Sequence, residues 1–276
     1  MTAFPAAETI RLDLEKGSGI CRPGKVPVEI LSQSTKEWFL DLARRIGTPV
    51  SQSADGDLVL SIRNESYEAD DSRTRGPNTN RKLGFHTDRC DVIGFLCLQP
   101  AKIGGENHVV SSPRIENIIR KEKPELHAVL CRPFPYKRHI VDKGNNLPFC
   151  EQPIFSWKDN HFACSYLRVL IERADQSPEC PNLSSEQRDA LDFFDSVCER
   201  ITLQTCFTLQ AGEILFLNNW TTLHRRTAFE DFKEKRRHLL RVWISVPNSR
   251  PLDESFRANF GATEAGAVRG GMLPLG

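Results

Sequence analysis

Three segments that are apolar on both faces constrain the fold of this 276-residue chain most strongly. They cover residues 91–98, 214–217 and 239–246. Because successive side chains of a strand point to opposite faces, a strand that is apolar throughout must be covered on both sides. Such strands belong in the middle of a layered structure, and the chain is long enough to bury a real core around them. We therefore expect a mainly β fold with flanking helices.

The charge balance excludes some classes of partner. The chain carries 37 basic and 36 acidic residues, so no global field would draw it to nucleic acid or to an anionic membrane. One basic run, residues 233–238, leads straight into an apolar strand, and we interpret it as a solvated loop. We expect a small-molecule substrate and a single domain over residues 1–276, with the region of about residues 1–80 packed on the core. A homo-oligomer is left open.

The cysteines and the N-terminus bear on the cellular compartment. The nine cysteines are scattered without the paired spacing of a zinc site, so free thiols and a reducing, cytoplasmic environment are expected. The first residues lack the basic and apolar regions of a signal peptide, and no apolar stretch approaches transmembrane length.

Local signals predict several elements. A capping box over residues 34–37 opens a helix to residue 46, Ser112 caps a helix through residue 121, and residues 184–187 cap a helix whose apolar stripe ends at Ile201. Residues 58–63 read as a strand, and a glycine turn at residues 101–107 is expected to form a hairpin that returns Asn107 towards residues 86–88. The segment 131–183 reads as loops and short edge strands, including a strand at 162–168.

The His86-Thr87-Asp88 stretch is the first candidate site. In an extended backbone residues i and i+2 project to the same side, so the imidazole of His86 and the carboxylate of Asp88 can converge on one point. A second, distant imidazole would complete the triad of two histidines and one carboxylate that binds iron(II) on one face and leaves the other face open. His224 is the candidate third ligand.

Arg241 lies inside the last apolar strand, and a buried arginine needs an anion. With a period of two, Arg241 shares one face with Leu239, Trp243 and Ser245. The planar guanidinium binds a carboxylate through two parallel hydrogen bonds, whereas a lysine offers only a point charge. The pattern therefore favours a dicarboxylate partner for Arg241.

Taken together, these motifs resemble the taurine dioxygenase-like family of iron(II)/2-oxoglutarate-dependent oxygenases, which includes the clavaminate synthase-like enzymes. The matching stretches follow one another in the family's order from about residue 47 to residue 247, and comprise residues 85–88, 104–106, 219–229 and 236–241. The separation of 138 positions between His86 and His224 suits this family. The resemblance implies a double-stranded β-helix, which is a jelly-roll barrel, with helices packed on one side.

The resemblance also implies roles for individual residues. His86, Asp88 and His224 would bind iron(II), and Arg241 would bind the distal carboxylate of 2-oxoglutarate. Further positions match family features and are expected near the cosubstrate or behind the ligands: Arg237, Asn107, Arg226 and Asn219. Asn107 departs from the family's usual threonine, which puts its contact with the cosubstrate in question.

The reaction implied by the resemblance consumes O2 and 2-oxoglutarate, releases succinate and CO2, and most often hydroxylates an unactivated C–H bond. The ionisable ligand Asp88 argues against the halogenase branch, which has a small residue there. Desaturation, cyclisation and epimerisation use the same ligands and stay open. A zinc hydrolase or a non-catalytic cupin-like protein fits less well, because neither needs a dicarboxylate partner for Arg241.

The substrate is the least constrained part of the interpretation. Tyr166 and Arg168 would share one face of the expected strand at 162–168, and Arg75 lies in the loop before the metal motif. We therefore hypothesise a small amino-acid-like or carboxylate-bearing substrate held by Arg168 or Arg75 with Tyr166 nearby. Surface salt bridges are the competing explanation for both arginines.

Overall fold

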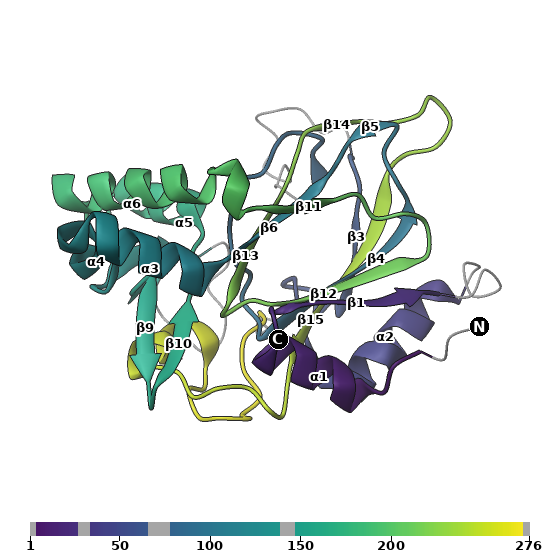
Figure 1. The fold of residues 1–276 in the computed structure, drawn as a ribbon, viewed down its shortest axis with the longest axis horizontal. Helices are drawn as coiled ribbons and strands as arrows, with labels where there is room; N and C mark the ends of the chain where they lie inside the picture. The colour runs from purple at the N-terminus through teal and green to yellow at the C-terminus, as the bar shows by residue number, and fades with distance from the viewer. Residues whose placement is uncertain (1–3, 27–33, 66–77, 139–146, 273–276) are drawn as a thin grey trace.

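The computed structural model describes residues 4–26, 34–65, 78–138 and 147–272. Its strands form two main antiparallel sheets, with helices outside them (Figure 1). The α-helices are α1 (Ala7–Lys16), α2 (Thr35–Ile46), α3 (Ser112–Glu122), α4 (Pro124–Leu130), α5 (Arg168–Asp175), α6 (Ser185–Cys198) and α7 (Arg257–Phe260), and short 3-10 turns cover Ile201–Leu203 and Glu254–Phe256. In the described part of the chain, no helix is both long and apolar enough to cross a membrane.

The larger sheet contains the three apolar segments as neighbouring strands. Its order is β1-β12-β4-β15-β2, and β3 also pairs with β15. The strands are β1 (Ile20–Lys25), β2 (Thr48–Val50), β3 (Val59–Ile62), β4 (Val92–Gln99), β12 (Glu213–Asn218) and β15 (His238–Ser245). The central position expected for 91–98, 214–217 and 239–246 is therefore confirmed.

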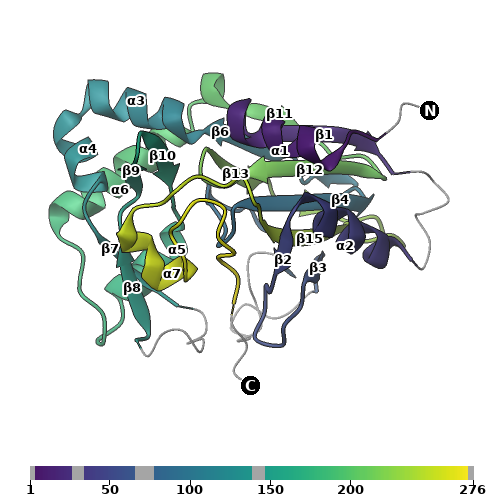
Figure 2. The same cartoon turned by 90° about the horizontal axis from the view of Figure 1, so that it is seen from below.

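The two faces of the larger sheet are covered by different layers. Leu240, Val242 and Ile244 pack with α1 and α2, which lie along the outer face (Figures 1 and 2). Leu239 and Trp243 pack on the inner face with Val109 of the second sheet. The alternation predicted for the last strand is thus confirmed, with Arg241 on the inner face.

The second sheet faces the first and has the order β11-β6-β13. Its strands are β6 (Asn107–Ser111), β11 (Thr205–Phe207) and β13 (Thr222–Arg226). Short antiparallel pairs complete the strand set: β5 (Ile103–Gly104) with β14 (Phe229–Glu230), β7 (Phe134–Lys137) with β8 (Phe149–Gln152), and β9 (Phe155–Lys158) with β10 (His161–Cys164). This arrangement agrees with the expected jelly roll, although the sheets are not closed into a continuous barrel.

The helices form two groups instead of packing on one side only. Helices α1 and α2 cover the larger sheet, whereas α3, α4, α5 and α6 gather with β9 and β10 at the other end of the molecule (Figure 1). The second group has its own core around Phe155, Phe194 and Tyr166. All nine cysteines are free, as expected.

Several local expectations need correction. Ser34 precedes α2 but makes no side-chain cap bond, because its ψ of 7° lies outside the extended region that a capping residue adopts. Ser111, whose side chain accepts from Arg114 N, caps α3 in place of Ser112. The capping box at Ser184 is present, but its helix ends at Cys198 and Ile201 is exposed in the following 3-10 turn.

The expected hairpin at residues 101–111 is also wrong. Gly104 and Gly105 have φ values of 70° and 71°, a left-handed conformation that suits glycine. This turn carries the chain from the larger sheet to the second sheet, where β6 pairs with β13 and not with β4. Asn107 nevertheless reaches the cavity described below, opposite Arg226.

Candidate metal centre

His86 and His224 are joined through their backbones. The amide of each donates to the carbonyl of the other, at 3.0 Å in both directions, as an isolated antiparallel bridge. Thr87 points the opposite way, into the protein, where its Oγ1 accepts from the amide of Tyr166 at 2.9 Å. The alternation predicted for His86, Thr87 and Asp88 is therefore observed, and it leaves both candidate ligands on one side.

The three candidate ligands converge. Their ligand atoms all lie within 4.8 Å of one another. His224 Nε2 lies 3.5 Å from Asp88 Oδ2, and the two imidazole centroids are 4.4 Å apart. A triad separated by 138 positions in sequence is thus assembled at the junction between β13 and the segment that carries His86 and Asp88.

Hydrogen bonds orient the ligands. His86 Nδ1 donates to the carbonyl of Gly84 at 2.9 Å, so the proton lies on Nδ1 and Nε2 is left for a metal. The amide of Asp88 donates to Asn219 Oδ1 at 3.1 Å, and Asn219 Nδ2 donates to the carbonyl of Cys90. Asn219 therefore supports the metal motif from behind. Asp88 Oδ2 is buried and has no hydrogen-bond partner among the described residues.

Burial and nearby charge set the protonation states. Burial and then the neighbouring His224 lower the pKa of His86 to about 4, so this imidazole is neutral at physiological pH. Burial alone would raise the pKa of Asp88, but the charge of Arg241 and the neighbouring imidazole of His224 outweigh it and hold that pKa well below its usual range. A neutral imidazole and an ionised carboxylate with a buried, unpaired Oδ2 among the described residues are suited to binding iron(II).

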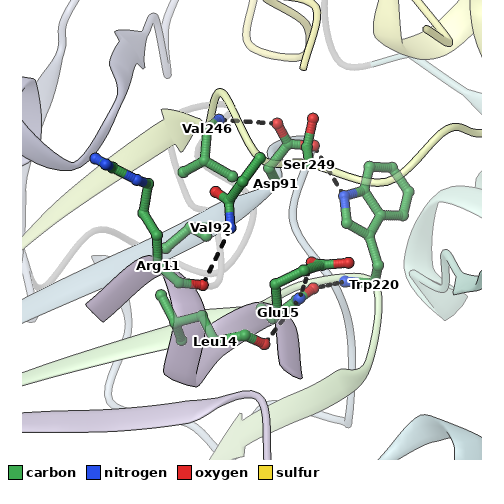
Figure 3. Close-up of a pocket in the computed structure, with 10 residues that line it drawn as sticks. Arg11, Leu14, Glu15, Asp91, Val92, Trp220, Val246 and Ser249 are labelled. Atoms are coloured by element: carbon green, nitrogen blue, oxygen red, sulfur yellow. Dashed lines mark hydrogen bonds between the residues drawn. The ribbon is translucent and has the colours of Figure 1, made fainter. Parts of the chain in front are cut away.

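A network on the far side of the metal motif fixes the start of β4. Asp91 accepts from the amide of Val246 at 3.0 Å and from Trp220 Nε1 at 2.9 Å (Figure 3). Arg269 of the C-terminal segment donates to the same carboxylate at 2.7 Å, and both side chains are fully buried. The small void beside Asp91, which Arg11 and Glu15 also line, has a volume of only about 10 Å³ and suits at most a water.

The triad opens on a much larger cavity of about 930 Å³. Both sheets, β7, β8, α5 and the C-terminal segment contribute to its wall. Basic side chains outnumber acidic ones there by eleven to five, although the whole chain has a formal net charge of only +1. This surplus makes the cavity suited to anionic ligands.

Arg241 and Arg237 both reach this cavity but differ in their contacts. Arg241 donates through Nε to Gln52 Oε1 at 2.7 Å, and its Nη1 lies 3.7 Å from Asp88 Oδ1. Arg237 is 3% exposed, and its Nη1 has no hydrogen-bond partner among the described residues. Burial lowers the pKa of Arg237 to about 10. Arg237 is therefore a buried cation that still requires an anion.

The expected strand with Tyr166 and Arg168 on one face is not formed. Strand β10 ends at Cys164, and Arg168 begins helix α5. Arg168 lies at the cavity but pairs with Glu172, Asp192 and Asp195. Tyr166 is fully buried and donates to Asp195 at 2.6 Å. Arg75 lies outside the described residues.

The sequence interpretation missed part of the cavity wall. Gln52, which lies two residues after β2, holds Arg241 in place. Tyr136, Gln152 and Ser165 form a buried polar wall in which Gln152 Nε2 donates to Ser165 Oγ at 2.8 Å and Tyr136 donates to the carbonyl of Ser165 at 2.9 Å. The only cue in the sequence was polar residues in short strands between prolines, which is a weak signal.

Comparison with known proteins agrees with this geometry. Residues 24–243 match the family described as “Taurine catabolism dioxygenase TauD, TfdA family”. The FR-33289 synthase of Streptomyces rubellomurinus is 31% identical over 266 residues, which cover 92% of this chain and 77% of that protein. The taurine hydroxylase-like protein SAT17 of Stachybotrys chartarum is 30% identical over 79% of this chain and 61% of that protein.

A solved structure shares the fold. An asparagine oxygenase in complex with Fe(II), 2S,3S-3-hydroxyasparagine and succinate superposes with a TM-score of 0.63 at 16% identity, over 86% of this chain and 80% of that chain. The family match covers most of the chain and includes all three converging ligands. The chain therefore belongs to the TauD/TfdA family and is a non-haem iron dioxygenase that depends on 2-oxoglutarate.

Proposed function

We propose that this enzyme binds iron(II) through His86, Asp88 and His224 and hydroxylates an unactivated C–H bond of a small anionic, amino-acid-like substrate. The observation that carries the proposal is the convergence of these ligands at the wall of a cavity of about 930 Å³ with a surplus of basic side chains. The balanced reaction converts substrate, O2 and 2-oxoglutarate into hydroxylated substrate, succinate and CO2.

Iron(II) with 2-oxoglutarate supplies the oxygen activation, and the residues of the chain supply position and charge. His86 is held in one tautomer by Gly84, and the backbone bridge fixes its distance from His224. Asp88 stays ionised and receives its orientation from Asn219. These contacts hold three ligand atoms on one side and leave the cavity side open for cosubstrate and substrate.

The contacts of the two arginines support a role for each at a different end of 2-oxoglutarate. Arg241 is close to Asp88, so it lies near the metal end of the bound cosubstrate. Arg237 lies four residues earlier, just before β15 begins, and its buried Nη1 lacks a partner among the described residues. We therefore assign the distal carboxylate to Arg237 and the metal-proximal carboxylate to Arg241, with Asn107 in the wall between the sheets.

The substrate class rests on charge. The basic surplus exceeds what the two carboxylates of 2-oxoglutarate can neutralise, so an anionic group on the substrate is favoured. An amino acid fits this requirement and agrees with the hydroxyasparagine held by the asparagine oxygenase. Arg168 remains a candidate for that anion, although it would have to exchange one of its carboxylate partners. The hydroxyl of Tyr166 and the guanidinium of Arg168 both donate to Asp195, so Tyr166 supports Arg168 through this shared partner.

The test is substrate-dependent succinate release. Iron(II)-loaded enzyme is mixed with 2-oxoglutarate and O2 across a panel of amino acids, small carboxylates, sulfonates and organic phosphates, with the matching uncharged amides and alcohols as controls. We expect one anionic class to raise succinate release and to gain one oxygen atom by mass spectrometry. Equal stimulation by anionic and uncharged compounds would refute the substrate class, and no succinate with any compound would refute the proposed activity.

A further inference from the structure

Arg226 lies two residues after His224 at the end of β13, so the two side chains project to the same face of the strand, and both line the cavity. It is 5% exposed. Its Nη2 donates to the carbonyls of Thr79 and Arg81, at 2.8 and 2.6 Å. Within the described residues no carboxylate pairs with this guanidinium, so its charge is held only by neutral carbonyl groups.

The hydrogen bonds from Arg226 hold residues 79–83, which form part of the cavity wall. The amide of Leu83 donates to the carbonyl of Arg226 at 3.0 Å, and the amide of Phe229 donates to the carbonyl of Asn80 at 3.0 Å. All but Asn80 of residues 79–83 line the cavity, and the chain continues from them directly to His86. Arg226 thus ties the wall beside the metal motif to the strand that carries His224.

A second buried cation lies next to Arg226. The guanidinium carbons of Arg226 and Arg237 lie 4.7 and 5.1 Å from the centroid of the same ring, that of Phe229. Two like charges that share one aromatic ring in a buried site repel each other. An anion bound at Arg237 would neutralise that repulsion and strengthen the bonds from Arg226 to the wall.

We propose that Arg226 is a positioning residue that couples occupation of the distal-carboxylate position at Arg237 to the order of segment 79–83. This inference rests on the proposed role of Arg237. Binding of 2-oxoglutarate orders segment 79–83, and by linkage an ordered segment 79–83 raises the affinity for 2-oxoglutarate.

A purely structural role for Arg226 makes a different prediction. Bonds to the carbonyls of Thr79 and Arg81 would then hold the wall equally well with and without 2-oxoglutarate. The two roles are separated by the response of the wall to the cosubstrate and not by the stability of the wall itself.

The experiment measures amide hydrogen exchange of a peptide covering residues 79–83 in the iron(II)-loaded full chain without oxygen. In the wild type, 2-oxoglutarate should slow exchange roughly 5- to 10-fold. The probe 2-oxobutyrate can chelate the metal but has no distal carboxylate, so it should give no such protection. In Arg226→Met the amides of this peptide should exchange fast with and without 2-oxoglutarate. Arg81→Ala is the matched control and should behave like the wild type, because Arg226 contacts the backbone carbonyl of Arg81 and not its side chain.

The outcomes separate the two levels of the proposal. The iron(II)–2-oxoglutarate absorption band reports cosubstrate binding independently, so its absence would refute the proposed function. Normal binding with equal protection by 2-oxoglutarate and 2-oxobutyrate would overturn the coupling. The comparison of these two ligands needs only the wild type, so the proposal stays testable even if Arg226→Met does not fold.

Discussion

Replacing Arg237 by lysine should weaken 2-oxoglutarate binding by about 10- to 100-fold. Arg237 is 3% exposed and its Nη1 lacks a partner in the part of the chain that the structure describes, so the bond it would make to a carboxylate is desolvated and charge-assisted. Such bonds contribute about 1.5–3 kcal/mol, which corresponds to that range of affinity. A Cβ on Gly105 would lie only 3.0 Å from Arg237 Nε, so the site is close-packed and a lysine has little room to find a new geometry.

The assay is a titration of iron(II)-loaded protein with 2-oxoglutarate under anaerobic conditions, followed through the metal-to-ligand absorption band. Lysine keeps the positive charge and most of the aliphatic stem. Any loss of 2-oxoglutarate affinity therefore measures the contribution of the planar guanidinium and not that of the charge. The probe 2-oxobutyrate serves as a second ligand, and its affinity should be nearly unchanged by the substitution.

Arg241→Lys is the matched comparison. Arg241 contacts Gln52 and approaches Asp88, so its substitution should weaken 2-oxoglutarate and 2-oxobutyrate alike. A result in which Arg241→Lys selectively weakens 2-oxoglutarate while Arg237→Lys leaves it unchanged would refute the assignment and return the distal carboxylate to Arg241, as the sequence alone suggested.

Three further predictions concern the metal, pH and stability. His86→Ala and His224→Ala should abolish iron-dependent succinate production while circular dichroism stays native, because both side chains line a cavity; near-native turnover would disprove the triad. In the metal-free protein, the unfolding free energy should fall as pH decreases from 6.5 towards about 4, since the unfolded chain protonates His86 first, with a slope of up to about 1.4 kcal/mol per pH unit. Urea titrations of His86→Gln, which should lack this slope, provide the check. Arg269→Met should cost about 3 kcal/mol by leaving Asp91 buried with an unpaired charge, and Asp91→Asn in the same chain should recover part of that loss in urea unfolding.

The central strands and the shared direction of His86 and Asp88 followed from local rules. Alternation places Arg241, Leu239 and Trp243 on the inner face because a period of two is a property of any strand. The same rule puts His86 and Asp88 on one side of an extended segment. These features depend on neighbours one or two positions away, so the sequence contains enough information to predict them.

Other features depend on tertiary contacts that a local pattern does not encode. The glycine turn at 104–105 is readable, but whether β6 then pairs with β4 or crosses to β13 depends on which sheet edge is free. Arg168 was expected on a strand, yet three carboxylates from α5 and α6 neutralise it at the start of a helix. The helices α1 and α5 were missed for the same reason, since both are stabilised mainly by the layers they cover.

The proposed metal centre combines local and tertiary information, because it lies where two distant segments of the chain meet. Asp88 and His86 obtain their direction from the chain, but their distance from His224 comes from two backbone hydrogen bonds between segments 138 residues apart. Two further residues hold the segments on either side of this contact. Arg226 donates to the cavity wall at residues 79–83, and Asn219 accepts from the amide of Asp88. A substitution of Arg226 or Asn219 should therefore change the spacing of the three ligands although the ligands themselves are unchanged. We expect it to reduce metal affinity more than it reduces the stability of the surrounding sheets.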